Sequence, residues 1–412
     1  MPLQSAFAFN ANEIFQTLGN MIISQRVFAD NIDRGGDSLL SVFKTDGSLY
    51  GDTKLFYATD ALKSYPWIQD SQDALNLLAT HRPADPKVQA IVIDTFRQIP
   101  LTTDAYMSKR AFADESAFSN FTTVIIGWMD DTKYLYDESV INVAVGTTKT
   151  SVGRQAATVD ITTARNNASS EEEANRLEAQ TIAKKVADIL NDLISPRNGK
   201  FYNDYGFRRK YSKDKFITVW NADAINKITN IDLPTIFHDA GLDQVVGKPY
   251  VLSKEYFGTV ITASNVATYS DSTPAAGKPI DSDDGSYTPG ASNANGTICS
   301  MVECDITVSA VTYHLFPGDE IPAGTVLAAS TAGDGSDGKM LYGDIYIVND
   351  KILFKIIHKD ALKYMSAFET NSEFWNPKNL STNRYLTFGY SNPFSSKGIR
   401  LQNYPFITVE SI

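Results

Sequence analysis

The stretch from residue 49 to residue 146 constrains the fold of this chain most, because two extended segments flank a polar region there and lead into a long helix. A two-stranded hairpin is only marginally stable alone in water, and three strands or a packed helix are normally needed for a stable sheet. The pattern therefore predicts a projecting hairpin whose apolar surface is covered by another subunit. We interpret it as an element of assembly.

The second extended segment, residues 87–101, is long for a strand. At about 3.3 Å per residue it would reach roughly 45 Å, and Pro86 and Pro100 mark its ends. Between the two segments, Ser71 predicts the start of a short helix that ends before Pro83. We therefore expect residues 44–104 to form one long hairpin with a folded tip.

Two amphipathic helices follow the hairpin. Apolar residues recur at steps of three and four after Asp114, which predicts a helix to about Val143, roughly 45 Å long. The second helix is expected after Ser170, where three glutamates at 171–173 complement the helix dipole, and its apolar face continues to Leu193. The polar region between them, residues 148–169, is predicted to be a loop.

The remaining segments predict an α+β protein. At the N-terminus, Asn12 is expected to cap a short helix that includes Phe15. A buried strand at 216–220, a helix capped by Asn221 and extended residues at 236–251 indicate a mixed unit. Residues 262–343 are rich in Ser, Gly, Asp, Thr and Pro but contain apolar extended runs, so we expect an inserted β subdomain there. Strands at 345–357 and 385–408 should return to the core.

Composition limits the classes of function. The 37 Lys and Arg against 48 Asp and Glu give a net charge of −11, which argues against a protein whose main task is to grip phosphate. Two cysteines are too few for a disulfide scaffold and favour synthesis in a reducing cytoplasm. No secretory signal begins the sequence, and no run of eighteen apolar residues predicts a membrane span.

No constellation of catalytic, cofactor-binding or metal-binding residues is evident, so we expect neither an enzyme nor a cofactor. The four histidines, His81, His238, His314 and His358, lack ligand partners at suitable spacing and are interpreted as structural. Cys299 and Cys304 are expected to be buried free thiols. The acidic clusters at 281–284 and 334–337 do not match a calcium loop and are interpreted as solvated turns.

One basic run interrupts the acidic chain. It comprises Arg208, Arg209, Lys210, Lys213 and Lys215, and it lies close to three aromatic residues, Tyr202, Tyr205 and Phe207. Mixtures of cations and aromatic rings are typical of surfaces that bind single-stranded nucleic acid. A solvated face or a contact between subunits is the alternative, because one loop does not offset an acidic surface. We predict a patch that contacts either DNA or another subunit.

The order of these segments resembles the major capsid proteins of tailed bacteriophages with the Hong Kong 97 fold. The likeness is carried by GDTKLFY at 51–57, residues 87–112, the helix at 115–136, FITVWNAD at 216–223, residues 345–354 and EFW at 373–375. Within this family, the chain most resembles the coat proteins of small short-tailed phages that infect Gram-positive bacteria. The resemblance rests on element order over most of the chain outside 262–343.

The resemblance implies a subunit with named parts. These are an N-terminal arm (1–43), an extended loop (44–104), a peripheral domain with a spine helix (105–169), an axial domain (170–261), an inserted β subdomain (262–343) and returning strands (344–412). The loop and arm would contact neighbouring subunits through apolar residues, for which we select Phe15, Leu55, Tyr57, Trp67, Ile91, Ile93 and Phe96.

The resemblance also implies partners and a location. The chain would form hexamers and pentamers of an icosahedral shell in the virion, after synthesis in the bacterial cytoplasm. A portal complex, a scaffolding protein and packaged double-stranded DNA on the inner face would be its other partners, with no membrane. Two alternatives remain at this point: an adhesin that binds host glycan through 262–343, although no fibre repeat is visible, and a hydrolase built from scattered carboxylates.

Overall fold

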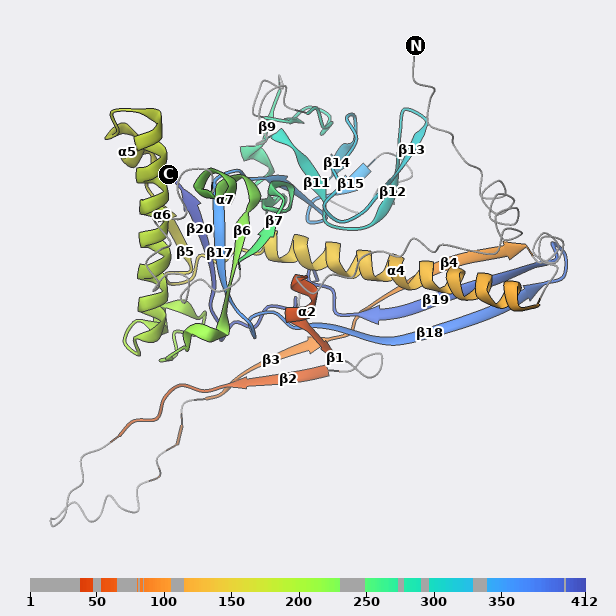
Figure 1. Ribbon diagram of the computed structural model, residues 1–412, viewed down its shortest axis with the longest axis horizontal. Helices are drawn as coiled ribbons and strands as arrows, with labels where there is room; N and C mark the ends of the chain where they lie inside the picture. The colour runs from red at the N-terminus through yellow and green to blue at the C-terminus, as the bar shows by residue number, and fades with distance from the viewer. Residues whose placement is uncertain are drawn as a thin grey trace.

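The computed structural model describes residues 38–46, 53–64, 80, 82–83, 85–104, 115–229, 249–272, 278–289, 296–328, 339–395 and 398–412. The molecule is elongated, as Figure 1 shows. A long helix, α4 (Glu115–Thr147), lies beside a long hairpin at one end, and a five-stranded sheet covered by helix α6 (Glu171–Ile194) forms the other. A small β module lies over α4, and a separate short hairpin projects from the middle.

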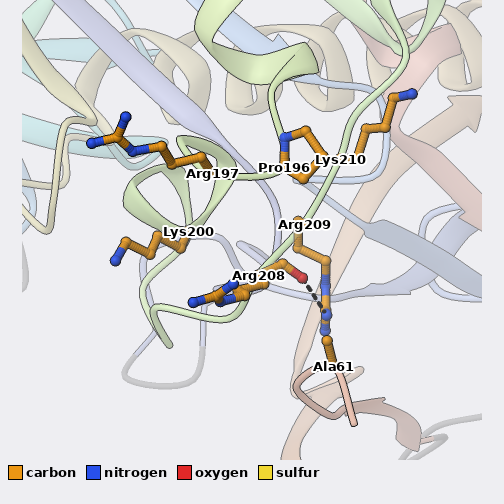
Figure 2. A pocket seen from close by; sticks show the side chains of 7 residues that line it. All are labelled: Ala61, Pro196, Arg197, Lys200, Arg208, Arg209 and Lys210. Carbon is orange, nitrogen blue, oxygen red and sulfur yellow. Dashed lines mark hydrogen bonds between the residues drawn. The ribbon is translucent and has the colours of Figure 1, made fainter. Parts of the chain in front are cut away.

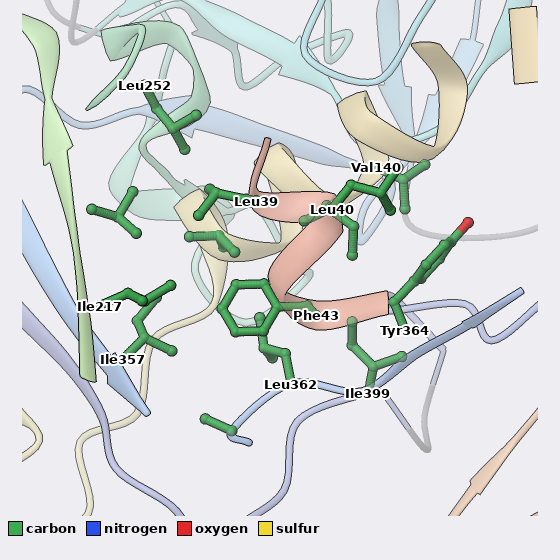
Figure 3. Close-up of a cluster of buried hydrophobic side chains, with 14 of the residues drawn as sticks. Leu39, Leu40, Phe43, Val140, Ile217, Leu252, Ile357, Leu362, Tyr364 and Ile399 are labelled. Carbon is green, nitrogen blue, oxygen red and sulfur yellow. The ribbon is translucent and has the colours of Figure 1, made fainter. Parts of the chain in front are cut away.

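The five-stranded sheet is covered on both faces. Its strands, in spatial order, are β5 (Ala156–Val159), β20 (Phe406–Ser411), β17 (Ile352–His358), β6 (Phe216–Asn221) and β7 (Tyr250–Leu252). Apolar residues of α6 pack on one face, and α2 (Leu39–Phe43) with the end of α4 packs on the other (Figure 3). Every residue of β17 is therefore buried. This unit confirms the predicted strand at 216–220 and the predicted α+β class.

The second large sheet supports the opposite end of the molecule. Its spatial order is β1 (Lys44–Asp46), β18 (Tyr364–Asn376), β19 (Ser381–Tyr390) and β4 (Thr95–Asp104). Pro100 lies inside β4 and does not end it, which an edge strand tolerates because one row of its backbone groups is unpaired. Tyr136 of α4 packs edge-on against Phe388 and Tyr390 of β19, so the helix and the hairpin share one core.

The predicted long helix is present and extends four residues beyond Val143. At 1.5 Å per residue its 33 residues span about 50 Å. Lys355 on β17 has no exposed surface, and its ammonium donates hydrogen bonds to the carbonyl oxygens of Gly146 and Thr148, each over 2.8 Å. This cation joins the sheet to the end of α4, where unpaired carbonyls favour positive charge.

The predicted helix after Ser170 is also present. The Ser170 hydroxyl accepts a hydrogen bond from the backbone N–H of Glu173, as an N-cap does. In the next predicted helix, α7 (Ala222–Thr229), the Asn221 side chain accepts from the N–H of Asp223. Both starts follow directly from the sequence.

Residues 262–343 supply most of a small apolar core. The extended runs expected at 298–311 and 325–328 contain β11 (Ile298–Ser300), β12 (Cys304–Val308) and β14 (Val326–Ala328), and β13 (Val311–Leu315) begins where the first run ends. The remaining strands of this region are β8 (Gly258–Val260), β9 (Ser270–Asp271), β10 (Ile280–Asp281), β15 (Lys339–Leu341) and β16 (Ile345–Val348). Strand β16 pairs with β8 and β11, so the module is attached through strands on both sides of it in sequence.

The prediction of one strand through residues 87–101 is wrong. The segment divides into β3 (Lys87–Val92), which pairs with β2 (Thr53–Ala58), and β4, which pairs with β19 in the other sheet. The Asp94 carboxylate lies at the break and accepts hydrogen bonds from the Thr95 hydroxyl and the N–H of Asn392. Among the strands that the structure describes, the longest hairpin is β18–β19, which the sequence did not reveal.

The prediction of a loop at 148–169 is also wrong in part. It contains β5 and a short helix, α5 (Ile161–Asn166), whose first turn is capped by Asp160 through the N–H of Thr163. Strand β5 forms because its backbone pairs in parallel with β20, a long-range contact that local polarity does not reveal. The helices predicted at 14–23 and 71–78, and the cap at Asp114, lie outside the described residues.

Candidate interaction surfaces

One face of the β2–β3 hairpin is apolar and exposed to solvent. The register places Leu55 opposite Ala90 and Tyr57 opposite Val88, and these four side chains share a face. Leu55 is 52% exposed, Tyr57 66% and Val88 50%. Neighbouring apolar residues left open in this way are typical of surfaces that bind another protein. We call these four residues the hairpin face.

The opposite face of the same hairpin belongs to the core of the subunit. Ile91 of β3 and Ile93 just beyond it have no exposed surface, and they pack with Met365, Ala367 and Leu401. The strand register explains this, because Ile91 and the residues of the hairpin face alternate across the sheet. The selection of Ile91 and Ile93 as residues that touch a neighbour is thus corrected. Phe96 on β4 is 41% exposed, and Phe15 and Trp67 lie outside the described residues.

Polar contacts to two other segments hold the hairpin where its strand pairing ends, at Ala58 and Lys87, and the connecting residues leave the body. We call this region the hairpin root. The Asp60 carboxylate accepts a hydrogen bond from the backbone N–H of Arg208 over 2.9 Å, and this bond is the largest cause of the lowered pKa of Asp60. The Arg209 guanidinium donates to the carbonyl oxygen of Thr59. On the other strand, the Gln89 amide donates to the carbonyl of Arg400 and accepts from the N–H of Gln402. The hairpin therefore leaves the body in a defined direction.

A basic pocket opens beside this root. Its accessible volume is about 380 Å³, and Figure 2 shows that its cations come from two loops: Arg197, Lys200, Arg208, Arg209 and Lys210 line it together with Ala61 and Pro196. The loops can meet because residue 199 is glycine: a Cβ there would lie 2.0 Å from the Arg209 carbonyl oxygen. We call this cavity the basic pocket.

The basic pocket contains three of the five cations predicted from the basic run. Lys213 and Lys215 belong to a separate 3-10 turn and do not line it. Arg197 and Lys200 were missed, because they lie eight or more residues before Arg208 and only the close approach at Gly199 brings them near. The signal was available in PRNGK at 196–200, a turn that follows a helix and carries two cations.

The aromatic residues near the basic run face inward. Tyr202, Phe207 and Tyr211 are buried, and the pKa of Tyr202 and of Tyr211 is raised to about 12, chiefly because burial disfavours the charged phenolate. Only Tyr205 among the aromatic residues singled out from the sequence is half-buried. The run therefore lacks the open stacking surface that the sequence pattern suggested.

The described cysteines and histidines have structural surroundings. Cys299 is a buried free thiol, and burial raises its pKa to about 12, which keeps it un-ionised; Cys304 is half-buried. His358 is buried, whereas His314 is exposed between Glu303 and Asp305. His81 and His238 lie outside the described residues. In the described part of the chain, no three side chains of metal-ligand type gather at one point.

The acidic turn at 281–284 is a backbone structure. The Asp281 carboxylate accepts from the N–H of Asp283, and that of Asp284 accepts from the N–H of Ser286. Such bonds are those of Asx turns, as predicted, while residues 334 and 337 lie outside the described ranges. Among the described helices, none has the length and hydropathy needed to cross a bilayer.

One family model and several solved capsid structures match this chain. The family model described as "Phi29-like phage major capsid protein" matches residues 3–394. A chain in the capsid structure of Staphylococcus phage Andhra aligns with a TM-score of 0.54 at 11% identity, covering 94% of this chain and 87% of that one. A chain in the mature capsid of bacteriophage PhiM1 aligns with a TM-score of 0.41 at 10% identity, covering 94% and 91%. No curated protein matches the sequence.

Proposed function

The chain belongs to the Phi29-like family of phage major capsid proteins, and from this premise we propose that its subunits join through the β2–β3 hairpin in a Hong Kong 97-type arrangement. As a major capsid protein it forms the shell of the phage head. Many copies of one chain assemble into such icosahedral shells, so each copy needs surfaces that recognise other copies.

The observation that carries the proposal is the exposed hairpin face. Complete burial of a side chain such as Leu or Val contributes about 1.5–3 kcal/mol, and three large side chains of this face still have half or more of their surface to bury. The hydrogen bonds at Thr59, Asp60 and Gln89 fix the root of the hairpin, which lowers the entropy lost when the face meets a neighbour. Modest contacts of this kind reinforce one another in a closed shell.

The parts of the subunit follow from the same proposal. Residues 44–104 form the extended loop, 105–169 the peripheral domain, 170–261 with 344–412 the axial domain and returning strands, and 262–343 the inserted module. Residues 1–43 form an arm that also contacts neighbours. Leu55, Tyr57, Phe96, Phe15 and Trp67 contribute to these contacts, the last two from segments outside the described residues.

Further partners belong to the proposal as well. The copies form hexamers and pentamers, a portal complex occupies one vertex, and a scaffolding protein guides closure around the space that receives double-stranded DNA. Synthesis takes place in the bacterial cytoplasm, and the phage is of the short-tailed type that infects Gram-positive hosts. The alternative of a glycan-binding adhesin is disfavoured, because the family match runs through the whole of 262–343.

Electron microscopy of the protein expressed with and without a co-expressed scaffold tests the proposal. We expect closed shells from the unaltered chain. A variant in which a short Gly-Ser linker replaces residues 62–85 should keep the unfolding transition of the unaltered protein but form no closed shells. Closed shells from this variant would show that residues 62–85 are not needed for closure and would leave the hairpin face as the only part of the hairpin to test. An unaltered chain that stays monomeric with and without scaffold would contradict the proposed function.

A further inference from the structure

We propose that the basic pocket is a docking site for carboxylate groups of a second copy of this chain. This inference rests on the proposed function, because it assumes that the hairpin contacts a neighbouring copy. It adds a charged contact at the root of the hairpin to the apolar contact on its face.

The pocket concentrates positive charge that the described part of the chain does not neutralise. No ion pair joins Arg197, Lys200, Arg208, Arg209 or Lys210 to a described carboxylate, although other cations nearby, such as Arg154 and Arg400, are paired. Asp60 lies beside the pocket, and its pKa is lowered first by the backbone hydrogen bonds from Arg208 and Ala61 and to a smaller extent by the charges of Arg209 and Arg208. Five cations gathered around one cavity repel each other, and an anion from outside would relieve this repulsion.

The position of the pocket favours a second copy as the source of the anion. Ala61, which lines the pocket, directly follows Asp60 at the point where the hairpin leaves the body. If the hairpin extends over a neighbouring copy, the cavity at its root lies on the same boundary between copies. That neighbour carries an excess of acid: the net charge of −11 already includes the five pocket cations, so the rest of its surface is more acidic still.

Nucleic acid fits the pocket less well. Binding of a polynucleotide backbone uses a stripe of cations along several phosphates, and single strands also need open aromatic rings. Lys213 and Lys215 lie apart from the pocket, and Tyr202, Phe207 and Tyr211 are buried. Guanidinium groups bind carboxylates through two parallel hydrogen bonds, as they bind phosphates, so the arginines alone do not choose between them. The compact shape of the pocket and the buried rings are what favour single carboxylates over a polynucleotide backbone.

Docking at the pocket would also act on the hairpin. Arg208 and Arg209 line the pocket and also bind the hairpin root. The backbone N–H of Arg208 donates to the Asp60 carboxylate, and the Arg209 guanidinium donates to the carbonyl oxygen of Thr59. A carboxylate that orders these loops would therefore order the hairpin root at the same time. Charged contacts across an interface mainly raise the association rate and select the correct partner, so the pocket should align the neighbour before the hairpin face is buried.

Zero-length crosslinking of empty shells tests the proposal without altering the protein. A carbodiimide joins a lysine amine to a carboxylate only when the two are in contact, and the pocket offers Lys200 and Lys210. Shells are assembled from an equal mixture of isotopically light and heavy chains, and mass spectrometry then distinguishes links between copies from links within one copy. Unassembled chains treated in the same way are the control.

We expect Lys200 or Lys210 to be linked to Asp or Glu of another copy in shells and not in unassembled chains. The inference is overturned if both lysines remain unlinked in shells or are linked only within one chain. It is also overturned if they react freely with an acetylating reagent in empty shells and become protected only in DNA-filled particles, since that result assigns the pocket to phosphate. If no shells form at all, the proposed function fails, which is a separate outcome.

A matched pair of variants gives an independent readout. Arg197→Gln, Lys200→Gln and Lys210→Gln together empty the pocket of three charges but keep Arg208 and Arg209, which hold the root. The control, Arg176→Gln, Lys184→Gln and Lys185→Gln, removes three charges from α6 outside the pocket. We expect the pocket variant to assemble about tenfold more slowly at low salt, the control to assemble normally, and the difference to shrink as salt screens the charges. Equal rates for the two variants would contradict the inference.

Discussion

Two hairpins of the described chain, β18–β19 and β2–β3, differ in what covers them. In β18–β19, the apolar residues Leu386, Phe388 and Tyr390 are buried, and Tyr136 of helix α4 packs against the two aromatic rings. In β2–β3, Leu55, Tyr57 and Val88 remain open to solvent although the other face of the hairpin is packed. Around Phe388 and Tyr390 the β18–β19 hairpin, here called the supported hairpin, is covered by its own chain, although Phe374 and Trp375 of β18 are exposed. The projecting hairpin, β2–β3, lacks a cover on its apolar face. The difference agrees with the proposal that the covered part of β18–β19 serves folding and the open face of β2–β3 serves assembly.

Truncation in the supported hairpin should have the largest effect on stability. Phe388 is buried, and Phe388→Ala removes the ring that packs against Tyr136 and Tyr390. Loss of a buried phenylalanine costs about 3–5 kcal/mol of unfolding free energy. Urea denaturation of the unassembled protein measures it, with Thr387→Ala on the other face of β19 as control. A loss below about 1 kcal/mol would mean that this hairpin is not part of the folding core.

Acid should weaken the five-stranded sheet, at the end of β17, by the next largest amount. Burial lowers the pKa of His358 to about 4, and its Nδ1 accepts a hydrogen bond from the N–H of Asp360, which requires the neutral ring. The unfolded chain binds this proton near pH 6.5 and the folded chain only near pH 4. The stabilisation from His358 is therefore complete above about pH 6.5 and is lost as the pH falls toward 4.

A pKa shift from 6.5 to about 4 corresponds to roughly 3 kcal/mol of unfolding free energy. Because some solvent still reaches the ring and screens its charge, we expect a loss of about 2 kcal/mol. Urea denaturation at a series of pH values measures it. His358→Phe should flatten the dependence between pH 6.5 and 4, because the ring stacked on Tyr404 is kept while the titrating nitrogen is lost. An unchanged dependence in this variant would exclude His358 as its source.

Loosening the root of the projecting hairpin should have a smaller and more local effect. Gln89→Ala removes both side-chain hydrogen bonds to the backbone of 400–402, at a cost of about 1 kcal/mol. Hydrogen exchange should show faster opening of β2 and β3, with no change in β18–β19. Gln89→Glu, which retains an acceptor for the Gln402 N–H, should fall between. Equal loosening of both hairpins would break the distinction between them.

The smallest effect on stability should accompany a large effect on assembly. Leu55→Ser with Tyr57→Ser changes only exposed side chains, so unfolding free energy should shift by no more than about 0.5 kcal/mol per substitution. The yield of closed shells should nevertheless fall sharply. Val311→Ser with Tyr313→Ser, on exposed positions of β13, is the matched control. Normal shell yield from the hairpin variant would remove the hairpin face from the interface.

Local sequence patterns were sufficient to predict the elements whose capping residues and apolar faces are close together in sequence. The helix after Ser170 could be predicted because its cap, its acidic first turn and its apolar face are all encoded within 24 residues. The strand at 216–220 could be predicted because a short apolar run next to Asn221 is distinctive. These features depend on neighbours in sequence, which is what a single sequence shows.

Features that depend on contacts between residues far apart in sequence could not be predicted. Residues 87–101 look continuous, and only the partners of β3 and β4 in two different sheets reveal the break at Asp94. In the same way, alternation marks Ile91 as apolar, but the packing of Met365 and Leu401 decides that it faces the core. The basic pocket forms because Gly199 lies close to Arg209. These residues belong to two loops that are not adjacent in sequence, so their approach could not be predicted from it.

Hydrogen exchange of unassembled protein and of closed shells tests the central claim most directly. The account predicts that amides of β2 and β3 exchange more slowly in shells than in unassembled protein, because a neighbouring copy covers the hairpin face. Amides of β18 and β19 near Phe388 should be protected equally in both, because their cover lies within the same chain. If β2 and β3 exchange at the same rate in both states, the projecting hairpin is not the element that joins the subunits.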